Sequence, residues 1–175
     1  MAKSDAGPAS VRRPEPIQSG HDLSSFDCGE PSLNDWLRRH ANRNQESGAS
    51  RTYVVCEHAG NRVIGYYCLA AGAVARSGAP GRVRRNMPEP IPVMVLGRLA
   101  IDRVQQGRGV GRGLLRDAIL RTLHAAEIIG IRAILVHAIS QEARRFYEQN
   151  GFHASPIDPM TLMLPLAEVQ REVSS

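Results

Sequence analysis

Lysine, cysteine and long apolar runs are scarce in this 175-residue chain. Its longest nearly uncharged apolar run, Val63–Ala75, is shorter than the roughly 20 residues that span a bilayer. The polar, proline-containing N-terminus has no apolar segment of the kind that forms a secretory signal. Cys28, Cys56 and Cys68 are odd in number, far apart in the sequence and without metal-ligand spacing. We therefore expect a cytoplasmic protein with reduced thiols, no membrane partner and no metal site.

Positive charge comes almost wholly from arginine, since Lys3 is the single lysine among 22 basic residues and the net charge is +5. Between residues 61 and 120, ten arginines stand against three acidic residues, a net charge of +7 for this segment. A basic central segment is typical of proteins that bind phosphate groups or nucleic acid. The length and a hydrophobic content of 42% indicate one globular domain. We expect that domain at residues 10–168, with loose tails at 1–9 and 169–175.

Apolar periodicity and turn residues predict an α/β fold. Ser32 and Asp35 match a capping box at the start of a first helix. The nearly continuous apolar strand 93–101 is typical of a strand that is buried on both faces. Residues 77–92 are expected to form a loop. Further strands are expected at 51–56, 63–75, 133–138 and 161–166, and further helices from Val110 towards Gly130 and over 141–150.

The strongest chemical signal is Gln106-Gly-Arg-Gly-Val-Gly111, which lies between a buried strand and a helix. Glycines there let an anion approach the unpaired backbone amides at the helix start. Arg103, Arg108 and Arg112 add positive charge. The segment lacks both the Gly-Lys-Ser/Thr ending of a Walker loop and the glycine spacing of a Rossmann site. We infer a phosphate-bearing ligand outside those two classes.

A second motif is Ala143-Arg-Arg-Phe-Tyr-Glu-Gln-Asn-Gly-Phe152. Tyr147 lies beside Phe146 on a short helix, and a tyrosine hydroxyl in that position can give a proton to a leaving group. An ordinary packed tyrosine fits the same pattern. His137, in a strand expected to be buried, fits a core histidine better than a catalyst.

Together these segments resemble the GNAT superfamily of acyl-coenzyme A-dependent N-acetyltransferases. Gln106-x-x-Gly109-x-Gly111 matches its pyrophosphate-binding motif, and Ala143-x-x-Phe146-Tyr147-x-x-x-Gly151-Phe152 matches its closing segment. The resemblance implies a mixed central sheet with two splayed parallel strands, flanked by helices, and acetyl-CoA lying between those strands. It also implies that Tyr147 is the general acid. The implied cofactor contacts are Leu99, Ala100 and Ile101 for pantetheine, Gln106, Gly107, Arg108, Gly109, Val110, Gly111 and Arg112 for pyrophosphate, and Ser140.

A narrower resemblance covers about residues 16–166. Phe26-Asp-Cys-Gly-Glu-Pro-Ser-Leu-Asn-Asp-Trp-Leu37, Ser50–Val54 and Leu96–Asp102 are similar to toxins of type II toxin–antitoxin modules in this superfamily. Such toxins acetylate the α-amino group of aminoacyl-tRNA and block translation, so the resemblance implies a ribbon-helix-helix antitoxin and a homodimer. Arg98 has two interpretations, a tRNA contact and a partner in an internal ion pair. The expected tRNA contacts are Arg38, Arg39, Arg43, Arg82, Arg84, Arg85 and Arg98, since arginine binds phosphate bidentately.

No Glu or Asp occupies an obvious general-base position, and Asp102 fits a capping role better. An α-amine titrates near pH 8 in peptides, and an ester lowers that value further, so water can take its proton. Two alternatives remain: an acetyltransferase of a protein N-terminus or small amine, and a non-catalytic module that binds acetyl-CoA or nucleic acid.

Overall fold

The computed structural model describes residues 11–175. These residues divide into two compact units. Unit 1 contains the chain up to Cys68 together with Arg98–Ala118, and unit 2 contains Leu69–Gly97 together with Ile119–Ser175. No helix in this described part is long and apolar enough to cross a bilayer. The single domain at 10–168 stays a prediction, and the expected tail at 1–9 lies outside the described residues.

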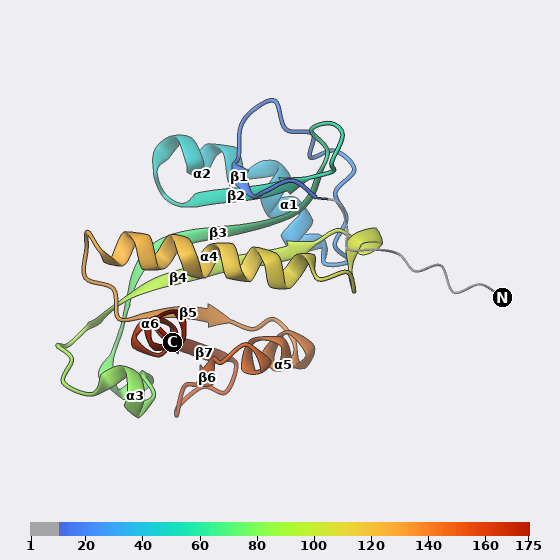
Figure 1. The fold of residues 1–175 in the computed structure, drawn as a ribbon. Helices are drawn as coiled ribbons and strands as arrows, with labels where there is room; N and C mark the ends of the chain where they lie inside the picture. Colours follow the sequence, from blue (N-terminus) through green and yellow to red (C-terminus); the bar gives the residue numbers. More distant parts are fainter. Residues whose placement is uncertain (1–10) are drawn as a thin grey trace. The chain divides into compact units, whose positions relative to one another are not determined.

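The strands form a mixed sheet in the order β1-β2-β3-β4-β5-β7-β6 (Figure 1). Its parallel pair joins Val93–Leu96 of β4 to Ala133–Val136 of β5. The parallel pairing ends at Leu96, although β4 continues to Ile101, and this confirms the predicted fold class. The strands are β1 (Glu15–Pro16), β2 (Arg51–Cys56), β3 (Val63–Val74), β4 (Ile91–Ile101), β5 (Ala133–His137), β6 (His153–Ala154) and β7 (Thr161–Pro165).

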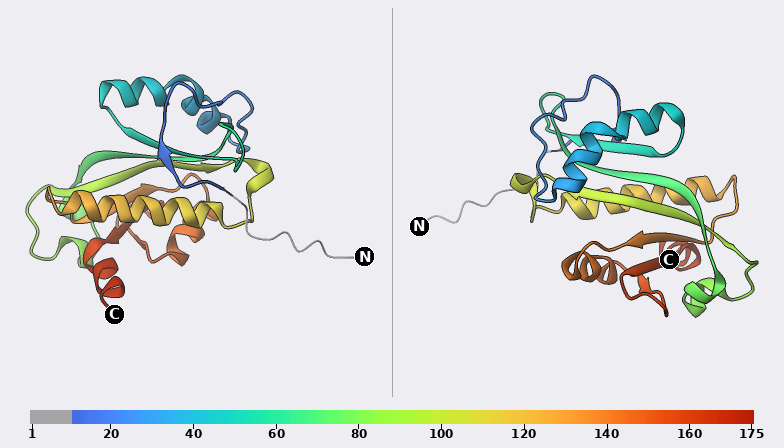
Figure 2. Two further views of the ribbon diagram at one scale, coloured as in Figure 1. Left: turned by 45° about the horizontal axis from the view of Figure 1, so that its top comes forward. Right: turned by 180° about the vertical axis from the view of Figure 1, so that it is seen from behind.

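In unit 1, helices pack on both faces of the strands (Figure 2). Helices α1 (Pro31–Arg39) and α2 (Ala41–Ser47) cover one face, where Trp36 and Tyr66 belong to the core. The first half of α4 (Val110–Ala126) covers the other face, and Leu114 lies against Gly65 of β3. A Cβ at Gly65 would lie 3.1 Å from Leu114 Cδ1, so the glycine allows this close approach.

The predicted capping box at the first helix is wrong. Helix α1 begins at Pro31, and neither Glu30 nor any other side chain caps its start. Ser32 and Asp35 are exposed on the helix. Proline favours the first helical position because its φ is fixed and its missing N–H needs no partner there, so it sets the start one residue earlier.

In unit 2, three helices contact β7: α3 (Gly81–Arg84), α5 (Gln141–Gln149) and α6 (Leu166–Val173). The expected loop at 77–92 therefore contains a helix, which is fixed because Val83 is fully buried among Ile91 and Met163. It also contains most of a 3-10 turn, Arg76–Gly78. The residues expected as a loose C-terminal tail are helical as far as Val173.

Candidate active site

The glycine-rich segment forms the predicted turn between strand and helix in unit 1. A 3-10 turn, Arg103–Gln105, follows β4, and α4 begins at Val110. Gly107 and Gly109 adopt left-handed φ values of 77° and 83°. Side chains other than glycine are strained in that region, so these two positions require glycine. The pattern therefore predicted both the turn and its location.

At this turn, a run of backbone amides has no acceptor among the residues that the structure describes. Within the described residues, the N–H groups from Gly107 to Arg112 donate to no carbonyl and no side chain. They stand at the N-terminus of a 17-residue helix, whose dipole adds partial positive charge. Arg108 and Arg112 are exposed, and neither forms an ion pair within the described part of the chain. This arrangement suits a bound phosphate or pyrophosphate.

The Phe26–Gly29 segment braces this loop, which gives that motif a physical role. The Gln106 side chain donates through Nε2 to the Cys28 carbonyl at 3.1 Å and to the Ile101 carbonyl at 2.9 Å. The Arg103 amide donates to the Asp27 carbonyl at 2.9 Å. Arg103 also lies 3.6 Å from the Asp27 carboxylate, so it is partly neutralised and less suited to a ligand than Arg108.

Asn34 holds the bracing segment in shape from α1. Its Oδ1 accepts from the Cys28 amide at 2.9 Å, and its Nδ2 donates to Asp27 Oδ1 at 3.0 Å. The Gly29 amide and the Asn34 side chain lower the pKa of Asp27, with Arg103 adding to the effect. Cys28 lies before the start of α1, and burial raises the pKa of its thiol.

Asp102 connects the strand end to the same segment. It is buried, it accepts from the Val104 amide at 3.1 Å, and it accepts from the Asp27 amide at 3.2 Å. The predicted capping role is therefore confirmed. With these bonds made, Asp102 serves as a structural anchor of the loop.

Tyr147 is buried on α5 in unit 2 between two aromatic rings. Its ring lies 5.2 Å from Phe146 and 5.3 Å from Phe152, measured between centroids. Ser140 caps the helix by accepting from the Ala143 amide at 3.0 Å. Gly151 ends the turn with a φ of 90°. Both ends of the helix are thus fixed, and so is the tyrosine ring. The cofactor contact of Ser140 stays a prediction.

The seven arginines predicted to bind tRNA differ in whether their side chains are held by partners within the described residues. Arg39, Arg43, Arg84 and Arg85 are exposed and form no ion pair within the described residues. Arg82 pairs with Glu168 at 2.9 Å, and Arg38 donates to the Phe26 carbonyl at 2.7 Å. Among the described residues, no carboxylate forms an ion pair with Arg98.

Arg98 instead lies over the Trp36 ring of α1, with its guanidinium carbon 4.4 Å from the ring centroid. A contact of this kind contributes about 0.5–2 kcal/mol. Trp36 stacks in turn on Tyr66, and both rings belong to the core of unit 1. The guanidinium is thereby held in one orientation.

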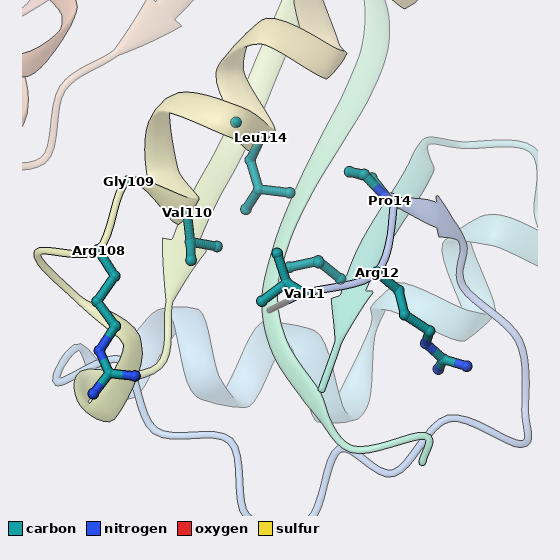
Figure 3. A pocket seen from close by; sticks show the side chains of 9 residues that line it. Val11, Arg12, Pro14, Arg108, Gly109, Val110 and Leu114 are labelled. Carbon is teal, nitrogen blue, oxygen red and sulfur yellow. The ribbon is translucent and has the colours of Figure 1, made fainter. Parts of the chain in front are cut away.

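An apolar cavity of about 240 Å³ lies beneath the first turn of α4 in unit 1. Val11, Val110 and Leu114 face it, whereas the Arg12 and Arg108 side chains point away (Figure 3). Its apolar lining does not suit a phosphate, so we place the anion site at the loop amides.

One group of possible metal ligands lies in unit 1, where donor atoms of Glu15, His21 and Cys56 are within 4.8 Å of one another. The Gln18 amide donates to His21 Nδ1 at 2.9 Å, so the neutral ring carries its proton on Nε2. That nitrogen bonds Glu15 at 2.9 Å. Burial also raises the pKa of the Cys56 thiol. These groups are arranged as a hydrogen-bonded pair beside a protonated thiol, a poor fit for a metal ion.

Comparison with known proteins defines the class of this chain. Residues 49–154 match the family model "Acetyltransferase (GNAT) domain". The chain belongs to the GNAT acetyltransferase family and is an acetyltransferase.

Three relatives are especially similar. The chain is 54% identical to the "tRNA-acetylating toxin" of Mycobacterium tuberculosis (strain ATCC 25618 / H37Rv), over 90% of this chain and 93% of that protein. It is 30% identical to AtaT complexed with acetyl-methionyl-tRNAfMet, with a TM-score of 0.86 over 93% and 99% of the two chains. It is 28% identical to a tyrosine-to-phenylalanine mutant of AtaT bound to acetyl-CoA and to the C-terminus of the antitoxin AtaR, with a TM-score of 0.81 over 94% and 99%.

Sequence reasoning missed two features. Asn34 was not recognised, because its partners are backbone and side-chain groups brought together only by folding. His137 was expected in the core, yet it is exposed at the end of β5. The expected burial of the whole strand predicted a core position, but His137 is the last residue of β5, where the run of buried residues ends. Its polar partner, Thr161, comes from β7.

Proposed function

We propose that this chain transfers the acetyl group of acetyl-CoA to the α-amino group of aminoacyl-tRNA and so blocks translation. The observation that carries the proposal is the 54% identity to a tRNA-acetylating toxin along 90% of this chain. The amides from Gly107 to Arg112, which find no acceptor within residues 11–175, support it because they fit the pyrophosphate of acetyl-CoA.

In the proposed reaction, the pyrophosphate binds the amides from Gly107 to Arg112, beside the Gln106 side chain that holds the loop, and pantetheine binds along Leu99–Ile101. The Ile101 carbonyl already accepts one bond, from the Gln106 side chain, so the loop and the pantetheine strand are held together. The amine attacks the thioester carbonyl, the C–N bond forms and the C–S bond breaks. Tyr147 gives its proton to the departing thiolate. Water takes the proton that the amine nitrogen loses, and proton exchange with water restores Tyr147, so the reaction balances without a metal ion.

The tRNA is proposed to bind the exposed arginines. Arg39, Arg43, Arg84 and Arg85 carry charge that no carboxylate of the described residues neutralises, so they are best suited to phosphate contacts. Arg38, Arg82 and Arg98 are held by partners within the protein and are expected to contribute less. The protein is expected to act in the cytoplasm, where charged tRNA is found.

A cognate antitoxin is proposed to neutralise the enzyme. AtaT has been captured with the C-terminus of its antitoxin AtaR, which supports a partner of the same kind here. We expect that antitoxin to have a ribbon-helix-helix domain, and we expect the enzyme to be a homodimer. Co-purification with the product of the neighbouring gene, followed by light scattering, tests both expectations.

Transfer of labelled acetyl groups from acetyl-CoA to charged tRNA tests the proposed function. Label on charged tRNA and none on uncharged tRNA is the expected result. Bound acetyl-CoA without label on tRNA would direct the search to peptide and small-amine acceptors.

A further inference from the structure

Three polar side chains are linked in series in unit 2. The Thr161 hydroxyl donates to Asp158 Oδ2 at 2.7 Å, and Thr161 Oγ1 lies 2.9 Å from His137 Nδ1. Thr161 on β7 is directly paired with His137 on β5, so the strand register itself brings the two side chains together. The Met160 amide bonds the other Asp158 oxygen at 3.0 Å and fixes the carboxylate.

The direction of these hydrogen bonds sets the tautomer of His137. Bonds from Thr161 and from the Met160 amide lower the pKa of Asp158, so this carboxylate is ionised and only accepts. The single proton of the Thr161 hydroxyl goes to Asp158. Thr161 Oγ1 must therefore accept from His137, and the imidazole proton lies on Nδ1. The lone pair is then on Nε2.

Nε2 is accessible. His137 is exposed, and within residues 11–175 no side chain or backbone group bonds its Nε2. Catalytic acid–base histidines commonly have this design: one ring nitrogen, here Nδ1, is held by a hydrogen bond, and the other, here Nε2, is available to take a proton.

The position of His137 in the sheet connects it with the reaction. It is the first residue of β5 beyond the last parallel pair, Leu96 with Val136. The resemblance to GNAT acetyltransferases implies that acetyl-CoA lies between the two splayed parallel strands. Three residues, Ala138 to Ser140, connect His137 to α5, the helix that carries Tyr147.

We propose that His137 is the general base of the transfer reaction, with Thr161 and Asp158 as positioning residues. This inference rests on the proposed function. Nε2 takes a proton from the acceptor amine as its nitrogen bonds the acetyl carbon, and the C–S bond breaks as Tyr147 protonates the sulfur. Proton exchange with water then restores both side chains.

The test compares kcat and KM for wild type, His137→Ala and His137→Gln with two acceptors, charged tRNA and an amino-acid methyl ester. We expect kcat to fall roughly 100-fold in both variants, within the usual range for a general base, while KM for acetyl-CoA is unchanged. Added imidazole should restore the activity of His137→Ala at least tenfold, because it can occupy the vacated exposed site. His124→Gln, at an exposed histidine of α4, is the control and should match wild type.

Thr161→Val tests the positioning role, since it removes the hydroxyl and keeps the side-chain shape. We expect about a tenfold loss of kcat, and Thr161→Ser should restore it. Undiminished activity of His137→Ala, or a loss that imidazole does not reverse, overturns the proposal.

The two acceptors separate this proposal from the proposed function. Acetylation of the methyl ester but not of tRNA contradicts the tRNA substrate, while the ester still measures the role of His137. If wild type acetylates neither acceptor, both proposals are wrong.

Discussion

The two units carry different kinds of chemical group. Unit 1 presents backbone amides at the start of α4, and its side chains mainly hold that loop in place. Unit 2 presents side chains: Tyr147 on α5, and the series formed by His137 on β5, Thr161 on β7 and Asp158 in the segment before β7. A backbone site depends on local conformation, whereas a side-chain series depends on strand pairing. Substitutions in the two units should therefore affect different steps, with KM for acetyl-CoA sensitive in unit 1 and kcat sensitive in unit 2.

The largest effect is expected for Tyr147→Phe. Loss of the proton donor should lower kcat by about 10²- to 10⁴-fold, since that is the usual contribution of a general acid. Acetyl-CoA affinity, measured by calorimetry, should be unchanged because the ring packing is kept. Tyr53→Phe, on a tyrosine stacked against Tyr67, is the matched control. A comparable loss in the control would show that kcat does not report proton donation.

Substitution of Gly109 by valine should raise KM for acetyl-CoA about 10- to 100-fold. A valine at a φ of 83° carries strain of about 1–3 kcal/mol, and relief of that strain turns the loop amides away from the ligand. Gly113→Ala is the control, because this helical glycine is exposed and nothing lies within 4 Å of its Cβ position. It should leave KM unchanged and stabilise α4 slightly. Equal KM values in the two variants would show that the loop does not bind acetyl-CoA.

Two neighbouring glutamines, Gln106 and Gln105, should differ in their effect on KM for acetyl-CoA. Gln106→Ala removes both side-chain bonds to Cys28 and Ile101, so the loop loses its fixed position. At about 1 kcal/mol for a typical hydrogen bond, KM for acetyl-CoA should rise about 5- to 10-fold with little change in kcat. Gln105→Ala should have less than a twofold effect. A fall in kcat without a change in KM would contradict a positioning role for Gln106.

Arginines with and without ion-pair partners should differ in tRNA binding. Arg84→Gln combined with Arg85→Gln is expected to weaken tRNA binding several-fold and to lower the salt dependence of log K by about 1 for each phosphate that these arginines neutralise. Arg82→Gln should change both quantities less, because Glu168 already holds that side chain. Filter binding at several salt concentrations measures both. A larger effect of Arg82 would contradict this ranking.

The smallest effect concerns pH. Hydrogen bonds from Gly29 and Asn34 hold the folded-state pKa of Asp27 below its unfolded value. The stabilisation is therefore complete above the unfolded value, about pH 4, and is lost as the pH falls through the lower folded value. Urea unfolding should show a slightly steeper loss of stability below about pH 4 for wild type than for Asp27→Asn. Parallel curves would show that Asp27 does not contribute.

Local patterns predicted the loop of unit 1 and the helix of Tyr147, because glycine spacing and caps act over a few residues. They did not predict the start of α1, where Pro31 overrode the Ser32–Asp35 pattern. Nor did they predict α3, which buries Val83 against distant strands. The exposure of His137 and its link to Asp158 follow from the register of β5 with β7, which no local pattern contains.

The most direct test of the central claim is to locate the acetyl group on the product. Charged tRNA is incubated with the protein and acetyl-CoA and digested with nuclease, and the released aminoacyl-adenosine is analysed by mass spectrometry. Our account predicts an acetyl group on the α-amino nitrogen of the aminoacyl moiety, absent with Tyr147→Phe. An acetyl group on a nucleobase, or unmodified aminoacyl-adenosine despite turnover of acetyl-CoA, would contradict it.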